Sequence, residues 1–409
     1  MSSSIKIGII GAGPAGLTLA NILQHNNIPC TIYDLDASPE ARNRGGSLDL
    51  HPRHGQLALR EAGLWDEFVK HARPESDVMK IVQQDGEVLW DGNGADACVV
   101  SEANKFDHRP EIDRGALMSI LLGGVDAQSV KWGKKLREVM PAPNEQYDLH
   151  FADGSTESAF DLVVGADGAW SKVRRWLSDT TPHYSGITAI ELWALNVKEN
   201  HPWMSSYVGK GSCFSFGEDR AIQIQVQGDG SIRTYASLRK PETFLHDCGI
   251  DWNDTAKARK EFVQQYFGDC GQDLKRMLFE SDDELVPRPL HMLPVGFRWD
   301  TRPGVTLLGD AAHLMTPFAG VGVNAAMADA LELARGLIKY TKAKGAGSLA
   351  GTLKTYEDEL FPRGEMFAQK TVNNMEKHFS ADGNIHMADR LRTAFGPAKT
   401  LAAPQWSPA

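Results

Sequence analysis

The sequence predicts an α/β fold in which a parallel sheet, assembled from segments far apart in the chain, is joined by a domain built on an antiparallel sheet. Three observations predict it. A continuous apolar run enters a glycine-rich turn and a helix near the N-terminus, over residues 5–23. A second apolar strand, 305–308, ends on Gly309 and Asp310. Between about 181 and 284, apolar and polar residues alternate with the period of a half-buried strand.

The size and charge of the chain exclude several classes of protein. Its 409 residues exceed the roughly 250 to 300 that one hydrophobic core supports, so we expect two or more domains. The 43 basic and 53 acidic residues give a net charge of −10 without a basic cluster, which argues against nucleic-acid binding. Five scattered cysteines fit a reducing cytoplasm. We expect neither a membrane-spanning helix nor a secretory signal.

The N-terminal segment predicts a strand, a tight turn and a helix. Residues 5–10 suit a strand buried on both faces, and Gly11, Gly13 and Gly16 follow in the pattern Gly-x-Gly-x-x-Gly. The glycines permit the turn, the approach of the backbone to a pyrophosphate and close helix packing, while the helix N-terminus favours an anion. Asp34 ends the next strand, where an acid contacts ribose hydroxyls. The pattern predicts a Rossmann-like domain and leaves NAD and FAD open.

Local periodicity predicts the elements that follow. We expect one helix over 55–69, a hairpin over 78–90, a helix over 112–122, and alternating strands and turns up to Asp167 and Gly168.

In the antiparallel stretch, Ile222, Ile224 and Val226 lie on one face of a strand and glutamines on the other, and residues 228–230 turn the chain into a second strand at 231–238. Such a half-solvated sheet is a natural wall for a pocket.

The C-terminal part is predicted as a linker at 345–351, a helical stretch over about 353–378, and a Pro/Ala-rich end. The whole chain is divided into a discontinuous nucleotide-binding domain at 1–75, 105–180 and 285–340, a substrate-binding β-sheet domain at 76–104 and 181–284, and a C-terminal helical segment and tail at 341–409.

The late strand decides between the two cofactors. It presents Asp310 at its carboxyl end, the edge at which ligands of open α/β sheets bind, and there the carboxylate can hold a ribityl chain. Downstream, residues 320–324 open a helix whose free N–H groups can face the pyrimidine side of a flavin, where reduction develops negative charge. The sequence therefore predicts FAD.

These residues have other possible structural roles. Asp310 is alternatively a helix cap or a core carboxylate. Asp310 and His313 resemble a pair of metal ligands, but no third and fourth ligand stand nearby, and no metal is predicted. His51 and His54 are interpreted as solvated loop histidines.

Three motifs, "GAGPAG", "DLVVGADGAWSKVRR" and "GDAAHLMTPFAGVGVN", resemble in this order the signatures of single-component flavoprotein monooxygenases with the para-hydroxybenzoate hydroxylase fold. The stretches "RGGSLDLHPRHGQLALREAGL" and "RPEIDRGALMSILL" are similar to the tetracycline-inactivating branch. The resemblance covers most of residues 5–340 and is weakest over 181–284.

The resemblance implies roles for individual residues. Asp34 would hold the ADP part of FAD, Asp310 the ribityl chain, and Arg114 would lie near the cofactor, although a helix-start arginine that pairs with Glu111 or solvent is the alternative. Asp167 would belong to a motif linked to FAD and NAD(P)H. The predicted cofactor-binding residues are Gly11, Gly13, Pro14, Ala15, Gly16, Asp34, Arg42, Ser47, Leu48, Asp49, Arg114, Asp167, Gly309, Asp310, Pro317, Gly320, Val321, Gly322, Val323 and Asn324.

Predicted substrate contacts are Glu191, Arg233, Pro317, Phe318 and Gly320. The chain departs from the tetracycline-inactivating branch at four positions. Leu35 stands where that branch has an arginine, and Glu191, Gly211 and Arg233 stand where it has glutamine, arginine and histidine. Tetracycline is therefore one candidate substrate among several.

The activity implied by the resemblance is oxygen transfer. NAD(P)H, bound transiently, would reduce FAD, the reduced flavin would capture O2 as a C4a-hydroperoxide, and the distal oxygen would pass to an electron-rich aromatic, enolic or polycyclic molecule. No catalytic side chain is predicted, and a cytoplasmic monomer is expected. The alternatives are a flavin oxidase or dehydrogenase without oxygen transfer, and a non-enzymatic FAD-containing protein that sequesters small molecules. A flavin-dependent halogenase is disfavoured, because its Trp-x-Trp-x-Ile-Pro signature is absent.

Overall fold

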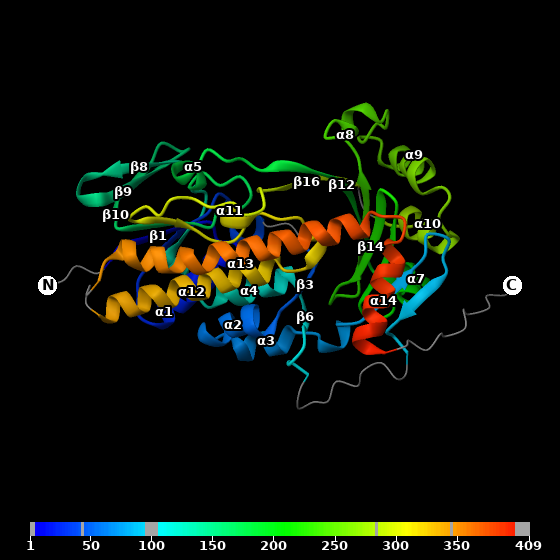
Figure 1. The fold of residues 1–409 in the computed structure, drawn as a ribbon, viewed down its shortest axis with the longest axis horizontal. Coiled ribbons are helices and arrows are strands. Elements are labelled where there is room, and N and C mark those ends of the chain that lie inside the picture. The colour runs from blue at the N-terminus through cyan, green and yellow to red at the C-terminus, as the bar shows by residue number, and fades with distance from the viewer. Residues whose placement is uncertain (1–4, 42–44, 95–104, 283–284, 344–346, 397–409) are drawn as a thin grey trace. The chain divides into compact units, whose positions relative to one another are not determined.

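The computed structural model describes residues 5–41, 45–94, 105–282, 285–343 and 347–396, whose elements form two compact units (Figure 1). Unit 1 consists of Met1–Ala72, Ile112–Ser185 and His291–Val372. Unit 2 consists of Arg73–Glu111, Gly186–Leu290 and Asn373–Ala409. Each unit is therefore built from three separate stretches of the chain.

Unit 1 contains a five-stranded sheet in the order β17-β11-β1-β2-β7. Each neighbouring pair is parallel, with Ile9 opposite Val164 and Val164 opposite Thr306. The carboxyl ends of the strands consequently lie at one edge, and the predicted pairing of the late strand with the N-terminal sheet is confirmed. The strands are β1 Ile7–Ile10, β2 Thr31–Tyr33, β7 Val130–Lys131, β11 Leu162–Gly165 and β17 Val305–Leu307.

Smaller elements complete unit 1. Strands β8 Leu136–Ala142, β9 Gln146–Phe151 and β10 Thr156–Phe160 form an antiparallel sheet, and β3 Ser47–Asp49 pairs with β6 Glu111–Asp113. The helices are α1 Pro14–His25, α2 Leu57–Glu61, α3 Trp65–His71, α4 Arg114–Gly123, α5 Arg174–Leu177, α11 Asp310–His313, α12 Gly322–Lys342 and the first part of α13 Leu349–His378.

Helices α12 and α13 run side by side (Figure 1), and α13 is anchored to the sheet by buried polar groups. Glu357 accepts hydrogen bonds from the Trp299 indole, at 2.9 Å, and from the Thr306 hydroxyl, at 2.8 Å. The Tyr356 hydroxyl donates to the carbonyl of Leu307, the last residue of β17, at 2.9 Å. The long C-terminal helix therefore fixes the strand that leads into Asp310.

Two predictions about unit 1 helices were wrong. The single helix expected at 55–69 is two helices, because Gly63 adopts a φ of +73° and ends the first one, and a π-helical turn at Pro52–Gln56 precedes them. Of the linker expected at 345–351, the last three residues belong to α13, which begins at Leu349, while residues 345 and 346 lie outside the described residues.

Unit 2 is built on a seven-stranded sheet in the order β16-β12-β15-β14-β13-β4-β5. The predicted hairpins are confirmed, with β4 antiparallel to β5 and Val226 of β14 opposite Ile232 of β15. The strands are β4 Met79–Val82, β5 Val88–Asp91, β12 His183–Ala194, β13 Ser212–Gly217, β14 Arg220–Val226, β15 Ile232–Arg239 and β16 Val286–Met292.

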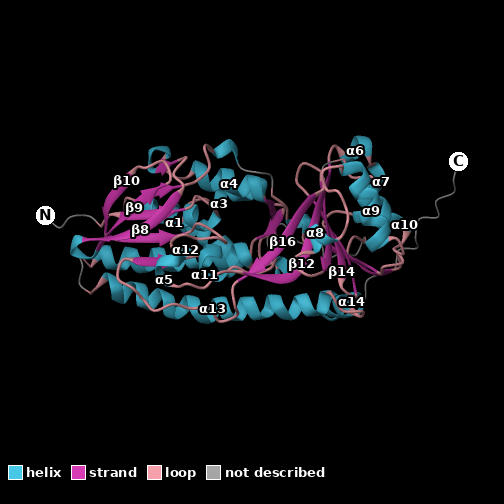
Figure 2. Ribbon diagram, turned by 90° about the horizontal axis from the view of Figure 1, so that it is seen from above, coloured by secondary structure: helices cyan, strands magenta, loops and turns pink. Residues whose placement is uncertain are grey.

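One face of this sheet is covered by helices, which Figure 2 shows beside the strands. Ile222 and Ile224 of the sheet and Phe262 of α9 belong to one buried cluster, while Gln223 and Gln225 lie half-buried on the other face, as predicted. The helices within 181–284 were not predicted. They are α6 Val197–Asn200, α7 Pro202–Val208, α8 Phe244–Asp247, α9 Thr255–Phe267 and α10 Gln272–Phe279. None of the described helices is both long and apolar enough to cross a membrane.

The last helix, α14 Gly383–Phe395, is attached to strand β13 by two hydrogen bonds of one buried side chain. The buried Asn384 side chain accepts from the Phe216 N–H at 2.7 Å and donates to the Phe216 carbonyl at 2.5 Å. The His378 ring stacks on the Phe216 ring with centroids 4.2 Å apart and planes 13° apart. Burial, with Arg390 and Lys377 nearby, lowers the pKa of His378 to about 4.

Acidification is expected to destabilise unit 2 through His378. Because the folded pKa lies below the ordinary 6.5, the contribution of neutral His378 to stability is present above about pH 6.5 and is lost as the pH falls toward 4. At pH 5 the loss amounts to about 2 kcal/mol. His378→Phe keeps an aromatic ring against Phe216, so the difference in Tm between pH 7.5 and pH 5 should be smaller than in the wild type. His246→Gln, at an exposed histidine, is the control; an unchanged pH dependence in His378→Phe would contradict the prediction.

Candidate functional site

The glycine-rich turn at the end of β1 leaves room for a ligand at one position only among its three glycines. A Cβ at Gly11, which has a φ of +106°, would lie 2.3 Å from the Ala166 carbonyl oxygen, and one at Gly16 would lie 2.0 Å from the Gly11 carbonyl oxygen. A Cβ at Gly13 would meet no atom within 4 Å. Gly11 and Gly16 are therefore required by packing, and Gly13 faces open space at the start of α1, as a pyrophosphate site requires.

Asp34 holds this turn from the end of β2. Its Oδ2 accepts from the Ala12 N–H at 2.6 Å and its Oδ1 from the Asp36 N–H at 2.9 Å, and the residue is 6% exposed. The carboxylate therefore lies beside the turn, where the sequence predicted it, and also stabilises the turn. Whether it contacts a ribose stays a prediction.

Asp310 is exposed although Gly309 and Ala311 on either side are buried. Within the described residues its side chain makes no hydrogen bond or ion pair, and it does not cap α11. The interpretations as a cap or a core carboxylate are therefore wrong. An unpaired carboxylate at the carboxyl edge of the parallel sheet is available to hydroxyl groups of a ligand.

Arg114 is another exposed charge of unit 1 whose side chain makes no hydrogen bond or ion pair within the described residues. It begins α4, its N–H donates to the Gly46 carbonyl at 3.2 Å, and a Cβ at Gly45 would lie 2.2 Å from its Cδ. No ion pair with Glu111 forms in the described part of the chain. The arginine therefore packs beside β3, whose residues Ser47, Leu48 and Asp49 are half-buried. Arg42 lies outside the described residues.

The turn that presents Asp310 is held by a buried ion-pair network. Gly309, with a φ of +61°, donates its N–H to Asp329 Oδ2 at 2.9 Å, and His313 Nε2 lies 2.6 Å from the same oxygen. Arg363 of α13 donates to Asp329 Oδ1 at 2.9 Å. Burial opposes a charged imidazole, but Asp329 raises the pKa of His313, and His313 and Arg363 lower that of Asp329 against its burial.

Helix α12 begins at open space. A 3-10 turn at Pro317–Ala319 ends on Gly320, which has a φ of +61°, and a Cβ at Gly322 would meet no atom within 4 Å. The first N–H groups of a helix have no intrahelical partner, so this end can bind an anionic or electron-rich group. Phe318 and Val321 are buried, whereas Pro317 is exposed and Val323 half-buried.

The side chain of Asn324 makes structural hydrogen bonds that the sequence did not predict. Its buried side chain accepts from the His51 N–H at 2.7 Å and donates to the Asp49 carbonyl at 2.8 Å. It therefore links the first turn of α12 to the segment that follows β3. A contact between Asn324 and a cofactor stays a prediction, and it would involve the backbone.

The Asp167 carboxylate is used locally. It accepts from the Ser171 hydroxyl at 2.5 Å and the Lys172 N–H at 2.6 Å, while burial raises its pKa. Arg174, which sequence reasoning did not single out, donates to the carbonyls of Ala311 at 3.0 Å and Ala169 at 2.6 Å. Arg174 thus ties the loop after β11 to the first turn of α11, at the edge that carries Asp310.

In unit 2, Glu191 and Arg233 lie together on the face of the sheet that the apolar cluster does not cover. Glu191 is 2% exposed, and its Oε1 accepts from Arg233 Nη2 and from the Trp193 indole, each at 2.8 Å. Its Oε2 accepts from Arg288 Nε. Burial alone would raise the pKa of Glu191, but Arg233, Arg288 and Trp193 hold it below its ordinary range. Sequence reasoning missed Trp193 and Arg288, which carry no motif.

This cluster has a cationic surplus, because two guanidinium groups share one carboxylate. The Arg233 guanidinium carbon lies 4.5 Å from the Tyr235 ring centroid and 5.2 Å from that of Trp193. The Arg288 side chain is 45% exposed. The predicted contacts Pro317, Phe318 and Gly320 belong to unit 1, and they stay predictions.

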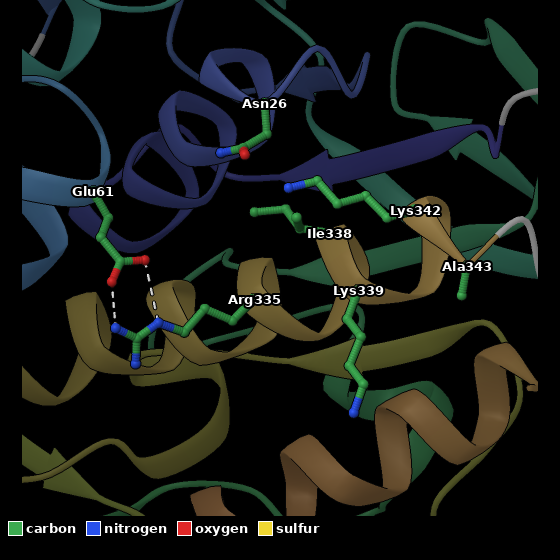
Figure 3. A pocket seen from close by; sticks show the side chains of 7 residues that line it. All are labelled: Asn26, Glu61, Arg335, Ile338, Lys339, Lys342 and Ala343. Carbon is green, nitrogen blue, oxygen red and sulfur yellow. Dashed lines mark hydrogen bonds and ion pairs between the residues drawn. The ribbon is translucent and has the colours of Figure 1, made fainter.

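A separate hollow of about 610 Å³ lies at the C-terminal ends of α1 and α12. Figure 3 shows the Glu61–Arg335 ion pair on its wall, with Asn26 and Lys342 nearby. Gly13 and Gly322 stand at the opposite ends of these two helices, so the hollow is distinct from the candidate site.

Comparison with known proteins agrees with this geometry. Residues 4–371 match the family described as FAD binding domain. The chain is 31% identical to "Monooxygenase penA" of Penicillium thymicola over 96% of this chain and 99% of the relative. The structure of Klebsiella pneumoniae HpxO with FAD and uric acid aligns with a TM-score of 0.76 and 20% identity over 96% of this chain and 94% of that one.

The structure of the tetracycline destructase Tet(55) aligns with a TM-score of 0.71 and 18% identity over 98% of this chain and all of that one, which shows a shared fold. The match to the family spans most of both units. The chain belongs to the FAD-binding-domain family and is an FAD-dependent monooxygenase of the para-hydroxybenzoate hydroxylase fold.

Proposed function

We propose that this enzyme uses NAD(P)H and O2 to hydroxylate or epoxidise a planar, electron-rich small molecule that carries an acidic oxygen. The observation that carries the proposal is the meeting, at one edge of the unit 1 sheet, of a glycine turn open at Gly13 and an unpaired carboxylate at Asp310. A flavin dinucleotide has a pyrophosphate and a ribityl chain that match these two groups in charge and hydrogen bonding.

In this proposal each part of FAD has a protein partner. The turn at Gly13 holds the pyrophosphate, Asp34 the adenosine ribose and Asp310 the ribityl chain, while the first N–H groups of α12 face the ring. When bound, FAD supplies the redox chemistry that passes electrons from NAD(P)H to O2 and one oxygen atom to the substrate. The protein orients the ring and keeps water from it.

NAD(P)H is proposed as a transient reductant. A single strand, Gly-x-Gly turn and helix unit is present in the described chain, at β1 and α1, and FAD occupies it in our proposal. The loop of Asp167 and Gly168, linked through the family resemblance to the nicotinamide cofactor, is the proposed point of contact. The cytoplasmic location and the monomeric state expected from the sequence are part of the same proposal.

The cationic cluster of unit 2 supports an acidic substrate. Glu191 is saturated by Arg233, Arg288 and Trp193, so it has little capacity left for a substrate donor. The half-exposed Arg288 guanidinium is the member of the cluster that a ligand can reach. A phenolate, enolate or carboxylate oxygen would balance the surplus positive charge, and arginine favours such planar anions.

Asp310→Ala should yield protein that binds FAD weakly and loses its yellow colour on gel filtration, because the ribityl hydroxyls lose their acceptor. Asp179→Ala, at another exposed acid of unit 1, is the matched control and should keep its flavin. The measurement is the ratio of flavin absorbance to protein absorbance. Full flavin content in Asp310→Ala would contradict the ribityl assignment.

Oxygen transfer itself is tested with the flavin-loaded enzyme and a panel of phenolic, indolic and polycyclic enolic compounds. At least one compound should accelerate NAD(P)H oxidation, followed at 340 nm, and gain one oxygen atom by mass spectrometry. NAD(P)H consumption that yields only hydrogen peroxide with every compound would favour the oxidase alternative. Absence of any stimulated consumption would favour a sequestering protein.

Arg288→Gln should weaken binding of salicylate by about tenfold and leave binding of neutral salicylamide nearly unchanged, because only the anion needs the lost charge. Binding is followed through the change in flavin absorbance on titration. Arg276→Gln removes an arginine on helix α10 of the same unit and serves as the control. Equal weakening of both compounds would contradict a charge-reading role for Arg288.

A further inference from the structure

One charged side chain of helix α13 reaches the buried carboxylate that holds the turn of Gly309 and Asp310. Arg363 Nη2 donates to Asp329 Oδ1 at 2.9 Å, and Arg363 Nη1 donates to Glu332 Oε2 at 2.8 Å. The Arg363 side chain is 13% exposed, and that of Asp329 is fully buried. Burial opposes a charged guanidinium, but Asp329 and Glu332 raise the pKa of Arg363. The two groups therefore form a buried ion pair at neutral pH.

The same carboxylate holds the turn from its other oxygen. Asp329 Oδ2 accepts from the Gly309 N–H at 2.9 Å and lies 2.6 Å from His313 Nε2. Helix α13 also contacts His313 directly, because a Cβ built on Gly364 would lie 3.4 Å from the His313 Cβ. Two successive residues of α13, Arg363 and Gly364, therefore contact the two side chains that hold the turn.

Gly309 lies between the first turns of two helices. A Cβ built on it would lie 3.2 Å from the Ala15 Cβ of α1 and 3.3 Å from the Ala326 Cβ of α12. The next residue is the exposed Asp310. A displacement of this turn would therefore move the Asp310 carboxylate relative to the starts of both helices, which are the ends predicted to face the cofactor.

The other polar attachments of α13 to this region act before the turn. Tyr356 donates to the carbonyl of Leu307, and Glu357 accepts from the hydroxyl of Thr306, both within β17. These contacts hold the strand. Among the described residues of α13, Arg363 is the one whose side chain pairs with the carboxylate that holds the turn.

The histidines beside this network add no positive charge to it through His54. Burial, followed by nearby positive charges that include Arg363, lowers the pKa of His54, which Asp329 opposes. His54 is therefore neutral near pH 7. His51 and His54 are both half-buried, and His54 Nδ1 has no hydrogen-bond partner among the described residues. The interpretation of both as solvated loop histidines is wrong.

We propose that Arg363 is a positioning residue for FAD, which acts through Asp329 on the Gly309 turn and so on Asp310, and that docking of α13 thereby strengthens cofactor binding. The inference rests on the proposed function, in which Asp310 holds the ribityl chain. A carboxylate that is already oriented binds its ligand more tightly, because the ligand does not have to order it. The coupling is reciprocal, so bound FAD must also strengthen the docking of α13.

The test is the dissociation constant of FAD for the flavin-stripped full chain, followed through the change in FAD fluorescence on titration. Arg363→Gln should raise this constant about tenfold, because the turn is then held less firmly. Asp310→Ala removes the acceptor of the ribityl hydroxyls. Adding Arg363→Gln to Asp310→Ala should therefore change the constant by less than about threefold, because a residue that acts through Asp310 has little left to position.

Glu357→Gln is the matched control, because it removes a different buried carboxylate that attaches the same helix to β17. It should lower the Tm of the flavin-stripped protein as Arg363→Gln does and keep the dissociation constant within about twofold of the wild type. Equal weakening of FAD binding by both variants at equal Tm overturns the proposal. Wild-type affinity in Arg363→Gln overturns it as well, and so does a full tenfold effect of Arg363→Gln in the Asp310→Ala background.

A measurement on the wild type keeps the proposal testable if Arg363→Gln does not fold. Bound FAD should slow hydrogen exchange of the backbone N–H groups around Arg363 more than those of α9 in unit 2. Unchanged exchange around Arg363 overturns the proposal. Failure of the proposed ribityl assignment is seen separately, because Asp310→Ala alone then binds FAD as tightly as the wild type. The inference alone fails when Asp310→Ala binds FAD weakly and Arg363→Gln binds it normally.

Discussion

The hydrogen bonds and ion pairs of the buried Asp329 carboxylate hold the turn of unit 1 that presents Asp310. The carboxylate accepts the Gly309 N–H and pairs with His313 and Arg363, so one charge joins the turn after β17 with helices α12 and α13. Removing one partner from such a buried network typically costs about 3 to 5 kcal/mol, because the remaining charge has no water to return to. The exposed position of Asp310 is therefore determined by this buried network, whose members do not themselves have to contact the cofactor.

A second link between distant segments of unit 1 is made by a neutral side chain. Asn324 joins the first turn of α12 to the backbone of Asp49 and His51, so the start of the helix and the segment that follows β3 are held together. Groups that stabilise developing charge work best when they are already oriented, because no energy is then spent on reorganisation during the reaction. In unit 2, the sharing of Glu191 by two arginines likewise holds the Arg288 guanidinium in one orientation.

The predictions that failed share one cause. A pattern in the local sequence does not indicate which residues far away in the chain will be in contact. The apolar period over 55–69 continues through Gly63, but its positive φ ends one helix and starts another. The helices of 181–284 were overlooked because their polar outer faces weaken the periodic signal, although Phe262 and Leu274 bury their inner faces. Arg174, Arg288 and Asp329 stand in stretches where nothing nearby in sequence indicates the carbonyl or the opposite charge they meet.

The sequence by itself determined the parallel and antiparallel sheets, the cofactor class, and the places of Gly13, Asp34 and Asp310, because glycine turns and strand ends are local features that place their residues at a known edge of a sheet. Only the tertiary structure decided which of these groups are free to meet a ligand. Asp310 is left unpaired, whereas Asp167 and the Asn324 side chain are occupied by other parts of the protein. That difference arises from contacts between residues far apart in the chain, and these form only when the chain is packed.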